Sequence, residues 1–390
     1  MAFTRGPALD DATSRVFLTK AMTEGQRMQD EAEILVVGAG PTGMSAALAL
    51  HDFGYQVLII DQYETGLDFS RAILVNSNTL RLLKPLGIAE KIIRRGIPFQ
   101  SLAIRGPGGS LIEGAVGSVD ADGIRPIALP QLMTEQCLLE GLLERQIKVE
   151  RPTRLIEVQQ DADQVLARVE TEGRERIIRC AYLLGADGSH SVVREQLGIA
   201  YHRSPRPLKM YSQDAILPWE DQPDLAIWIL DSGAAIAMKI AEDRVRFAAT
   251  DKATFETLGF VSRIRETTWE SEFDVFFAQV DRYGSGRVWI AGDAAHVHSP
   301  IGGRGMNMGI ADGIRFAEAL KANDLKGYAA DRHAVSGPWV RKNQRLTEWI
   351  SDRSPKGALV RPFMRAGFRM LSALYKEQAA RKIFAAVALG

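Results

Sequence analysis

The 390-residue sequence contains little cysteine, with Cys137 and Cys180 as its two thiols. They form no CxxC pair, so the sequence predicts neither a disulfide framework nor a thiol redox motif. Two buried core thiols in a reducing compartment are the simpler interpretation, and this favours the cytoplasm. Net charge is also missing, because 48 Lys and Arg balance 48 Asp and Glu. The chain as a whole therefore has no electrostatic attraction to nucleic acid, and we expect no such partner.

Long hydrophobic runs are absent as well. No apolar run approaches the roughly 20 residues that span a bilayer, and the N-terminal region mixes acids with bases and has no apolar core of a signal peptide. We interpret residues 1–30 as a polar N-terminal arm. The remaining chain, in a sequence with 46% hydrophobic residues, is long enough to form two packed domains.

The first informative stretch is EILVVGAGPTGMSAALALHDFGYQVLIID, which begins at Glu33 and ends at Asp61. Its apolar runs at 34–37 and 56–60 predict two buried strands, and the Ala- and Leu-rich segment between them predicts a helix. The stretch is therefore typical of a βαβ unit that binds a dinucleotide.

Each special residue of this unit has a physical role. Gly38 makes the turn, Gly40 lets a pyrophosphate approach the backbone, and Gly43 permits close packing of the helix on the strand. Asp61 ends the second strand, where its carboxylate can accept hydrogen bonds from ribose hydroxyls. The pattern does not distinguish NAD from FAD, since both present an ADP half to the same turn.

A second strand-to-glycine junction lies in GRVWIAGDAAHVHSPIGGRGMNMGIADG, residues 286–313. We expect a short buried strand at 288–290 that ends at Gly292, where no side chain obstructs a ligand. The adjacent Asp293 can accept hydrogen bonds from a polyol.

The same stretch continues into a predicted helix. Gly302, Gly303 and Gly305 allow backbone N–H groups to face a ligand directly. The helix that follows is anchored by apolar residues at helical spacing, namely Met306, Ile310 and Ile314. A helix N-terminus favours negative charge, which a reduced flavin carries at its N1–C2=O edge.

His296 and His298 form an HxH pair in this stretch. They lie on one segment without a carboxylate or thiol at ligand spacing, so we expect no zinc site.

A third junction occurs in AYLLGADGSHSVVRE, where an apolar strand stops at Gly185 and a helix opens after Ser189. Upstream, SRAILV places Arg71 ahead of an amphipathic helix whose expected core residues are Leu80, Leu83 and Ile88. A surface cation is the alternative interpretation of Arg71. Residues 101–130 are expected to be β structure with a turn at 107–109, and a helix begins near Pro130 with Gln131 at its start.

Residues 196–280 are predicted to form a mostly antiparallel sheet, with strands at 214–217, 225–230, 234–240 and 244–249. Tyr211, Trp228 and Met238 are candidates for an apolar pocket, but ordinary core positions are the preferred interpretation. His202 and Tyr211 are also candidates for binding or deprotonating a phenol. Position alone supports neither, and we assign no side-chain base.

From residue 341 onward the chain is basic, with eleven Lys and Arg and three Asp and Glu. Arg361, Arg365 and Arg369 repeat every four residues and share one face of a predicted helix, while Phe368, Leu371 and Leu374 are available for another. A helix packed on the nucleotide-binding domain with a solvated basic face is the preferred interpretation. A helix on a membrane surface or an acidic partner is the alternative.

The three junctions together resemble the class A flavoprotein monooxygenases, the p-hydroxybenzoate hydroxylase-like aromatic-ring hydroxylases. The resemblance is carried by GAGPTG, SRA, GADGSHSVVR and GDAAHVHSPIGGRGMN, and it covers roughly residues 31–330. It implies an α/β fold in which a Rossmann-like FAD-binding domain of the p-hydroxybenzoate hydroxylase type carries an inserted, mostly antiparallel β-sheet substrate domain and a C-terminal helical segment.

The domain boundaries that follow are predictions. The FAD-binding domain takes 31–100, 126–195 and 281–330, and the substrate domain takes 101–125 and 196–280. Basic C-terminal helices take 331–390.

The resemblance also implies roles for residues at the matching positions. The pyrophosphate would meet Gly38, Gly40, Pro41, Thr42 and Gly43, and the adenosine would meet Asp61 and Gln62. The pyrophosphate and ribityl region would meet Arg71, Gln131, Asp187, Gly188, Gly292 and Asp293. The isoalloxazine would be wrapped by Pro300, Arg304, Gly305, Met306 and Asn307, with the backbone of Pro300, Gly302 and Gly303 at the reacting face.

Arg304 departs from the pattern, because many relatives have Gln there. A cation beside the flavin pyrimidine would favour the anionic reduced form.

The implied activity uses NAD(P)H to reduce non-covalently bound FAD, and O₂ then forms a flavin C4a-hydroperoxide that hydroxylates a phenolic, N-heteroaromatic or polycyclic substrate. We expect a monomer or homodimer. Three alternatives stay open: a flavin halogenase, whose WxWxIP signature is not found here; a flavoprotein reductase or a quinone- or isoprenoid-pathway oxidoreductase of the same fold; and a flavin-binding protein that senses or associates without turnover.

Overall fold

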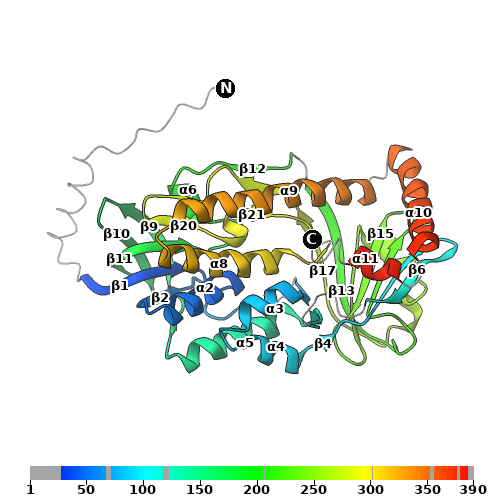
Figure 1. Ribbon diagram of the computed structural model, residues 1–390, viewed down its shortest axis with the longest axis horizontal. Coiled ribbons are helices and arrows are strands. Elements are labelled where there is room, and N and C mark those ends of the chain that lie inside the picture. The colour runs from blue at the N-terminus through cyan, green and yellow to red at the C-terminus, as the bar shows by residue number, and fades with distance from the viewer. Residues whose placement is uncertain are drawn as a thin grey trace.

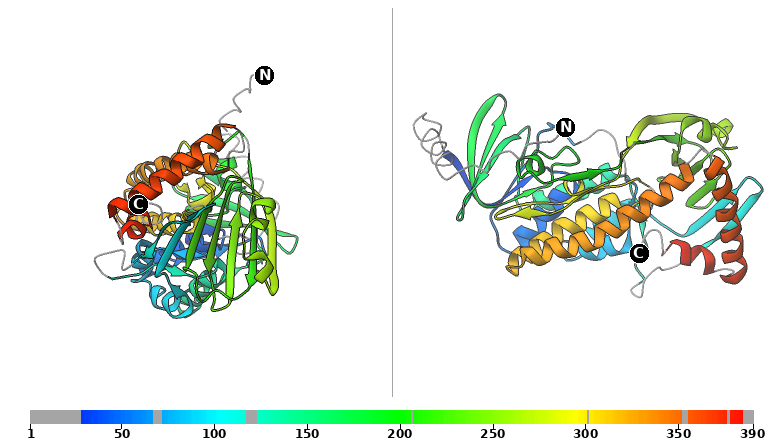
Figure 2. Two further views of the ribbon diagram at one scale, coloured as in Figure 1. Left: turned by 90° about the vertical axis from the view of Figure 1, so that its right-hand side faces the viewer. Right: turned by 90° about the horizontal axis from the view of Figure 1, so that it is seen from above.

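The computed structural model describes residues 28–66, 72–116, 123–205, 207–300, 302–351, 355–375 and 378–384. Its two largest sheets lie at opposite ends of an elongated molecule, with 8 strands in one and 7 in the other (Figure 1). Helix α9, Leu325–Ser351, extends from the first sheet toward the second and links the two halves (Figure 2).

The 8-stranded sheet has the order β19-β20-β11-β1-β2-β8, and β10 and β9 extend it from β11. Its strands are β1 Met28–Val37, β2 Val57–Ile60, β8 Val149–Glu150, β9 Arg154–Gln160, β10 Val165–Thr171, β11 Arg174–Gly185, β19 Gly284–Ser285 and β20 Val288–Ile290. Strands β2, β1, β11 and β20 run parallel. Their carboxyl ends therefore lie along one edge, where ligands of open α/β sheets bind.

These central strands are parallel and buried because their residues are apolar on both faces. Leu35, Val36 and Ile60 have no exposed surface. Helix α2, Pro41–Asp52, packs against both α5, Gln131–Glu144, and α8, Gly305–Lys321.

Strand β1 begins six residues before Ile34, so the boundary predicted for the N-terminal arm is wrong at residues 28–30. Met28 and Asp30 pair with Ile177 and Ile178 of β11. Polar residues extend the strand because the long β10–β11 hairpin offers backbone partners beyond the apolar run.

The 7-stranded sheet has the order β17-β13-β16-β15-β14-β5-β6 and is antiparallel except between β14 and β5. Its strands are β5 Ser101–Gly106, β6 Gly109–Ala115, β13 Leu208–Ile216, β14 Leu225–Ile229, β15 Ala234–Lys239, β16 Arg244–Ala249 and β17 Glu266–Val275. The predicted turn at 107–109 and the four predicted strands are thus confirmed, while β17 was not predicted.

Alternation along β13 gives this sheet two different faces. Tyr211 packs with Trp228, Phe247 and Phe255 in an aromatic cluster on the face covered by the short helix α7, Lys252–Glu256. We call this the outer face. On the opposite, inner face, Met210 contacts the cluster that includes Val340 of α9.

The three candidates for an apolar pocket are therefore core residues, which was the preferred interpretation of the sequence. Tyr211 and Trp228 lie in the outer-face cluster, while Met238 packs on the inner face with residues of β5 and β14.

Asp214 and Arg246 form an ion pair on the inner face, and their exposed fractions are 8% and 6%. The Nε and Nη2 groups of Arg246 donate to the two carboxylate oxygens of Asp214 at 2.5 and 2.6 Å. Arg246 also lies over the ring of Trp269, at 5.1 Å from the centroid. The two strands place these residues directly opposite each other.

Shorter elements connect the two halves. Two 3-stranded sheets join β12 Tyr201–Arg203, β18 Ala278–Val280 and β21 His296–Val297, and β3 Leu74–Val75, β7 Ile127–Ala128 and β4 Ile97–Pro98. The remaining helices before α8 are α3 Ser77–Leu83, α4 Ala89–Arg95 and α6 Val192–Gln196, with 3-10 turns at Val261–Arg263 and Gly292–Ala294. Leu80, Leu83 and Ile88 are buried as predicted.

The C-terminal helices α10, Pro355–Tyr375, and α11, Ala379–Phe384, pack against β6 of the second sheet. The preferred interpretation of α10 was therefore wrong about the domain on which it packs, and its basic face is solvated only at Arg369. Arg361 is 2% exposed and donates to the carbonyl of Asp231, and Arg365 donates to the Asp231 carboxylate. The arginines are used as hydrogen-bond donors to a turn of the second sheet, while Phe368 packs on its apolar cluster. Within the described ranges, no helix is long and apolar enough to cross a membrane.

We expect Arg246→Met to destabilise the protein by about 3–5 kcal/mol, because it leaves the Asp214 carboxylate buried without its partner. The double variant Asp214→Leu/Arg246→Met should recover most of that loss, since apolar residues of similar volume replace a buried pair at little cost. Urea unfolding of both variants measures the difference. Equal destabilisation of the single and double variants would contradict this account.

Candidate functional site

Four loops meet at the carboxyl edge of the parallel strands. In spatial order they follow β2, β1, β11 and β20, and they contain the predicted positions Asp61, Gly38 to Gly43, Asp187 and Asp293. The three junctions that are separate in the sequence are therefore brought together at one edge of one sheet.

The first loop is shaped by glycines whose missing side chains leave space for backbone. Gly38 has φ of +101°, and a Cβ there would lie 2.3 Å from the carbonyl oxygen of Ala186 in the loop after β11. A Cβ on Gly43 would lie 1.9 Å from the Gly38 carbonyl oxygen, which is the close helix-to-strand packing expected.

Gly40 differs from these two, because a Cβ there would meet nothing within 4 Å. It is the N-cap of α2, has no side-chain cap and is followed by Pro41. An open N-terminus of a 12-residue helix suits a phosphate.

Thr42 has a structural position within the same loop. A Cβ on Gly292 or Gly309 would approach the Thr42 hydroxyl oxygen to 2.5 or 2.3 Å. The three residues therefore hold α2, α8 and the loop after β20 in direct contact.

Asp61 follows β2 and is only partly exposed. Its carboxylate accepts hydrogen bonds from the backbone N–H of Ala39 at 2.7 Å and of Tyr63 at 2.9 Å. This contact fixes the carboxylate beside the glycine loop and leaves lone pairs for a further donor. Gln62 is exposed.

Asp187 follows β11 and has one unpaired oxygen. Its Oδ2 accepts from the Val193 N–H at 3.2 Å, while Oδ1 is buried and has no hydrogen-bond partner. Burial raises the pKa of this carboxyl. Gly188 beside it has φ of +80° and open space at the Cβ position.

Asp293 lies in the 3-10 turn after β20 and is exposed. The turn is fixed to α8, because the N–H of Gly292 donates to the Asp312 carboxylate at 3.0 Å. The Asp293 carbonyl accepts from the hydroxyl of Tyr201 at 3.0 Å.

The loop before α8 forms the end of the site that faces the second half. The Gly303 N–H donates to the Pro300 carbonyl at 2.9 Å, and Gly302 and Gly303 have positive φ. Arg304 is the N-cap of α8 without a side-chain cap, so the N–H groups of Gly305 and Met306 begin the helix. Pro300 is exposed.

Asn307 uses its side chain within the protein. Its amide nitrogen donates to the carbonyls of Leu74 and Gly303 at 2.8 and 2.6 Å, and its oxygen accepts from the Asn76 N–H at 3.0 Å. Its side chain therefore anchors the start of α8 to β3, which leaves the backbone for any ligand contact.

Gln131 and Arg71 were predicted to act together. Gln131 begins α5, and its side-chain oxygen accepts from the Ala72 N–H at 3.3 Å. Arg71 lies outside the described residues.

Asp312 was missed as a site residue, although it holds the site together. It has no exposed surface, and its carboxylate accepts from Gly292, from His296 at 2.7 Å and from Arg332 of α9 at 2.7 Å. Burial opposes its ionisation, but the interactions with His296, Arg332 and Gly292 outweigh burial and lower the pKa of Asp312. No motif pointed to it, because the sequence does not reveal which helical acid faces inward.

A second polar contact fixes the Pro300 loop to α9. The Ser299 N–H and hydroxyl both reach the side-chain oxygen of Asn343, at 3.0 and 2.9 Å, and the hydroxyl also meets Thr347 at 2.8 Å. These α9 residues were not anticipated, since the basic composition of the C-terminal region concealed them.

The histidines of the HxH pair have different environments. His296 is bound to Asp312, whereas the Nδ1 of His298 meets the Ser299 carbonyl at 2.8 Å and its Nε2 has no partner. Burial lowers the pKa of His298 to about 4, so the ring is neutral at pH 7. Where the structure describes side chains, no group of three or more His, Cys, Asp or Glu could hold a metal ion.

The two candidates for phenol activation do not face the loops. Tyr211 is on the outer face of the second sheet, where its hydroxyl lies 2.8 Å from the side-chain oxygens of both Gln213 and Glu270 and can donate to either. His202 is exposed on β12. The inner face instead presents the polar side chains of Ser212, Asp214 and Arg246.

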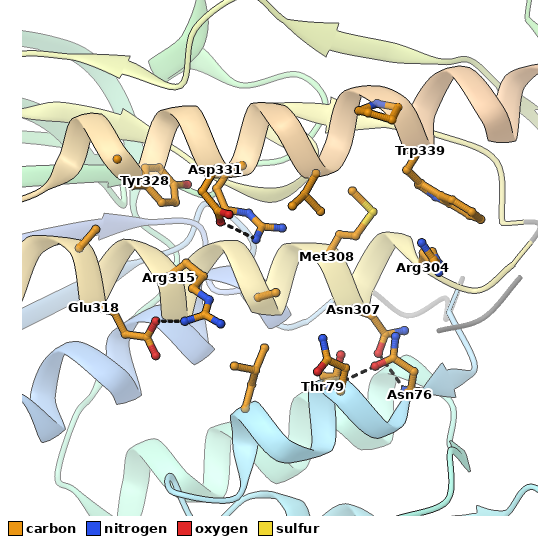
Figure 3. A pocket seen from close by; sticks show the side chains of 18 of the residues that line it. Asn76, Thr79, Arg304, Asn307, Met308, Arg315, Glu318, Tyr328, Asp331 and Trp339 are labelled. Carbon is orange, nitrogen blue, oxygen red and sulfur yellow. Dashed lines mark hydrogen bonds and ion pairs between the residues drawn. The ribbon is translucent and has the colours of Figure 1, made fainter. Parts of the chain in front are cut away.

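A groove of about 860 Å³ runs along α8 between α3 and α9 (Figure 3). Arg304, Asn307 and Asn76 lie at one end, and Arg315 and Glu318 lie toward the other. The Arg304 guanidinium carbon lies 3.8 Å from the centre of the Trp339 ring.

The site has the features that FAD requires. An uncapped helix N-terminus lies beside an open glycine position, an orphaned carboxylate oxygen lies at Asp187, and an exposed carboxylate lies at Asp293. These groups follow parallel strands in the order in which an extended dinucleotide would meet them.

A family model described as an FAD binding domain matches residues 31–248 and 212–337 of this chain. A 6-methylpretetramide 4-monooxygenase of Streptomyces rimosus is 28% identical over 85% of this chain, which spans 65% of that relative's length. A rifampicin monooxygenase of Streptomyces venezuelae is also 28% identical over 85% of this chain and 74% of that protein.

Two solved structures resemble the whole described fold. The p-nitrophenol 4-monooxygenase of Pseudomonas putida has a TM-score of 0.78 at 21% identity, over 91% of this chain and 97% of that one. An anhydrotetracycline hydroxylase of Streptomyces rimosus has a TM-score of 0.71 at 25% identity, over 92% and 76%. The predicted fold class is confirmed.

We expect Asp312→Asn to destabilise the protein by about 3–5 kcal/mol, because the Arg332 guanidinium stays buried and loses its carboxylate partner. The matched control is Asp331→Asn, which removes the exposed partner of the same arginine and should cost at most about 1 kcal/mol. Chemical denaturation measures both.

The pH dependence follows from the lowered pKa of Asp312. Its stabilisation is complete above the unfolded pKa of about 4 and is lost as the pH falls through the lower folded pKa. The stability difference between wild type and Asp312→Asn should therefore shrink only below about pH 4. A difference that already disappears between pH 7 and 5 would contradict this assignment.

Proposed function

This chain belongs to the FAD binding domain family, and from that premise we propose that it is a monooxygenase that uses NAD(P)H and O₂ to hydroxylate an aromatic substrate. The proposal rests chiefly on one observation. The loop that precedes α8 lies at the end of an FAD-suited edge, so that the N-terminus of this helix opens on the side where the second sheet begins.

The chain itself holds the cofactor in this proposal. The N-terminus of α2 at Gly40 and Pro41 binds the pyrophosphate, and Asp61 with Gln62 binds the adenosine. Asp187 and Gly188, with Arg71 and Gln131, bind the pyrophosphate and ribityl region. The open positions at Gly40 and Gly188 support these roles, because no side chain would obstruct the ligand.

The flavin end is held by backbone. The N–H groups of Gly305, Met306 and Asn307 surround the pyrimidine, and the N-terminus of the 17-residue helix α8 favours the negative charge of a reduced flavin. Pro300, Gly302 and Gly303 border the reacting face with backbone atoms, since their loop contributes no acidic or basic side chain before Arg304.

Bound FAD supplies the redox chemistry that the side chains lack, accepting hydride from NAD(P)H and activating O₂. The protein positions the aromatic ring and excludes water, which would divert reduced oxygen to hydrogen peroxide. The segments 101–125 and 196–280 bind the substrate in this proposal. Their inner face combines apolar residues such as Ile236 with the polar pair Asp214 and Arg246.

The proposed activity therefore requires FAD, O₂, a reduced nicotinamide nucleotide and a small aromatic molecule as ligands. A monomeric or homodimeric state and a cytoplasmic location complete the proposal. Their support is sequence composition alone.

Oxygen and NAD(P)H consumption by the FAD-loaded protein tests the activity across phenols, N-heteroaromatics and polycyclic quinones. We expect the cognate class to stimulate both uptakes in a one-to-one ratio, with little hydrogen peroxide. Substrate reduction that proceeds equally well without oxygen would instead identify a reductase, and absence of steady consumption with every compound would favour a binding protein.

Asp293→Ala tests the proposed ribityl contact. Loss of a charged hydrogen-bond acceptor costs about 1.5–3 kcal/mol, which raises the Kd for FAD by about 10–100-fold. The control Asp281→Ala removes another exposed carboxylate from a nearby turn and should leave FAD affinity unchanged. Flavin fluorescence titration measures Kd, and wild-type affinity in Asp293→Ala would remove this residue from the site.

A further inference from the structure

Arg304 carries hydrogen-bond donors that no residue in the described part of the chain uses. The residue is 8% exposed, and its Nε and Nη2 groups are buried without a hydrogen-bond partner. Its flat face is occupied, because it lies over Trp339. The unused donors are therefore those along one edge of the guanidinium.

Two other arginines show what this edge binds. Arg246 directs Nε and Nη2 to the two carboxylate oxygens of Asp214 at 2.5 and 2.6 Å. Arg145 does the same with Asp52 at 2.6 and 2.7 Å. The Nε and Nη2 pair forms a fork that matches the spacing of two oxygens on a carboxylate or phosphate. At Arg304 the fork is present, and none of the described residues supplies its oxyanion.

A second unused donor lies beside the first. Trp339 is 7% exposed, and its indole Nε1 is buried without a partner. Both residues line the groove along α8, and Figure 3 shows them side by side at its Arg304 end. An unpaired buried donor costs about 1–3 kcal/mol, so two at one place indicate that a ligand completes them.

The cationic and acidic side chains are unevenly distributed along the groove. Its Arg304 end carries the cations Arg304 and Lys342, which both lie over Trp339, whereas its acidic members lie further along. Those acids are engaged, because Glu318 pairs with Arg315, Asp331 pairs with Arg332 and Asp324 accepts from Gly327. The Arg304 end is therefore the one suited to an anion.

We propose that this end of the groove is an oxyanion subsite that holds a phosphate group of the reduced nicotinamide nucleotide. The proposal rests on the proposed function, because it deepens the assignment of that co-substrate. The three glycine junctions provide no separate place for the nicotinamide nucleotide, since all three lie on the edge of the sheet that is proposed to bind FAD.

The length and lining of the groove favour a nicotinamide nucleotide as its ligand. The α8 residues that line it extend from Arg304 to Ala322, about 27 Å along the helix axis. Its volume is within the range of small-molecule sites. Apolar surfaces of Leu82, Met308 and Val335 lie along it and suit the flat faces of a base or nicotinamide ring.

The groove is not the place for the adenine half of FAD, because α8 packs on α2 through a different face. The face of α8 that contacts α2 is marked by Gly309 and Gly313, where a Cβ would approach Thr42 to 2.3 and 2.5 Å. The groove lies on another face of the helix. Among the described lining residues none comes from the second sheet, so the groove is also separate from the proposed aromatic site.

Anaerobic reduction of the FAD-loaded protein at varied NADH and NADPH tests the subsite, because it separates the Kd of the nucleotide from the limiting rate. We expect Arg304→Gln to raise that Kd by about 10–100-fold, as expected for the loss of a charged fork. Trp339→Phe keeps the stacked ring, removes Nε1–H and should raise Kd by about 3–5-fold. Arg174→Gln, which removes an exposed cation of β11 that does not line the groove, is the matched control and should leave Kd unchanged.

Two further readouts separate the possible failures. If Arg304→Gln shifts the flavin spectrum or FAD affinity while the nucleotide Kd stays at the wild-type value, the fork serves the flavin and the proposal is overturned. An equal rise of Kd in Arg174→Gln would also overturn it, because the effect would then follow from the loss of any surface cation and not from the fork.

Inorganic pyrophosphate is the second probe, followed by tryptophan fluorescence of the FAD-loaded protein. If neither nicotinamide nucleotide reduces the wild type, the proposed function fails. Pyrophosphate binding that is lost in Arg304→Gln would then support the oxyanion subsite and overturn its assignment to a nicotinamide. Equal pyrophosphate binding by wild type and Arg304→Gln would overturn the subsite itself.

Discussion

The buried carboxylate of Asp312 is the interaction on which the geometry of the site depends. It joins three separate parts of the chain, because it accepts hydrogen bonds from the Gly292 loop, from His296 and from Arg332 of α9. An ion in this position is stable only when every lone pair has a donor. The loop after β20 and the helices α8 and α9 are therefore held in one arrangement, and the exposed Asp293 is positioned by its neighbour.

Close backbone packing provides the complementary constraint. Gly38, Gly43, Gly292 and Gly309 each lie where a Cβ would overlap Ala186, Gly38 or Thr42. The four loops consequently approach one another more closely than side chains would permit. Polar anchors determine the direction of each loop, and glycines determine the distance between them, so that the N-termini of α2 and α8 both open toward the same edge.

The sequence predicted these features where local chemistry determines them. The strand-turn-helix junctions, the turn at 107–109 and the buried Leu80 and Ile88 all follow from patterns of neighbouring residues. Asp312, Arg332, Asn343 and Thr347 could not be found in this way, since their importance depends on contacts between residues 16 to 48 positions apart. The same reason explains the error at α10. The spacing of Arg361 and Arg365 correctly placed them on one face, but nothing local showed that the face turns toward Asp231.

Several buried polar groups that fix one element to another are hydrogen-bonded, whereas several at the proposed ligand surfaces have atoms that are not. Asp312, Asp214, Ser299 and Asn307 are buried and hydrogen-bonded, and each fixes one element to another. By contrast, oxygen or nitrogen atoms of Asp187, His298, Arg304 and Trp339 are buried without hydrogen-bond partners, beside the FAD edge or at the end of the adjoining groove. Because each such atom costs free energy in the empty protein, binding that supplies its partner recovers this cost. Ligand binding is therefore expected to stabilise the folded chain at these positions, while the paired carboxylate of Asp312 holds the neighbouring elements together.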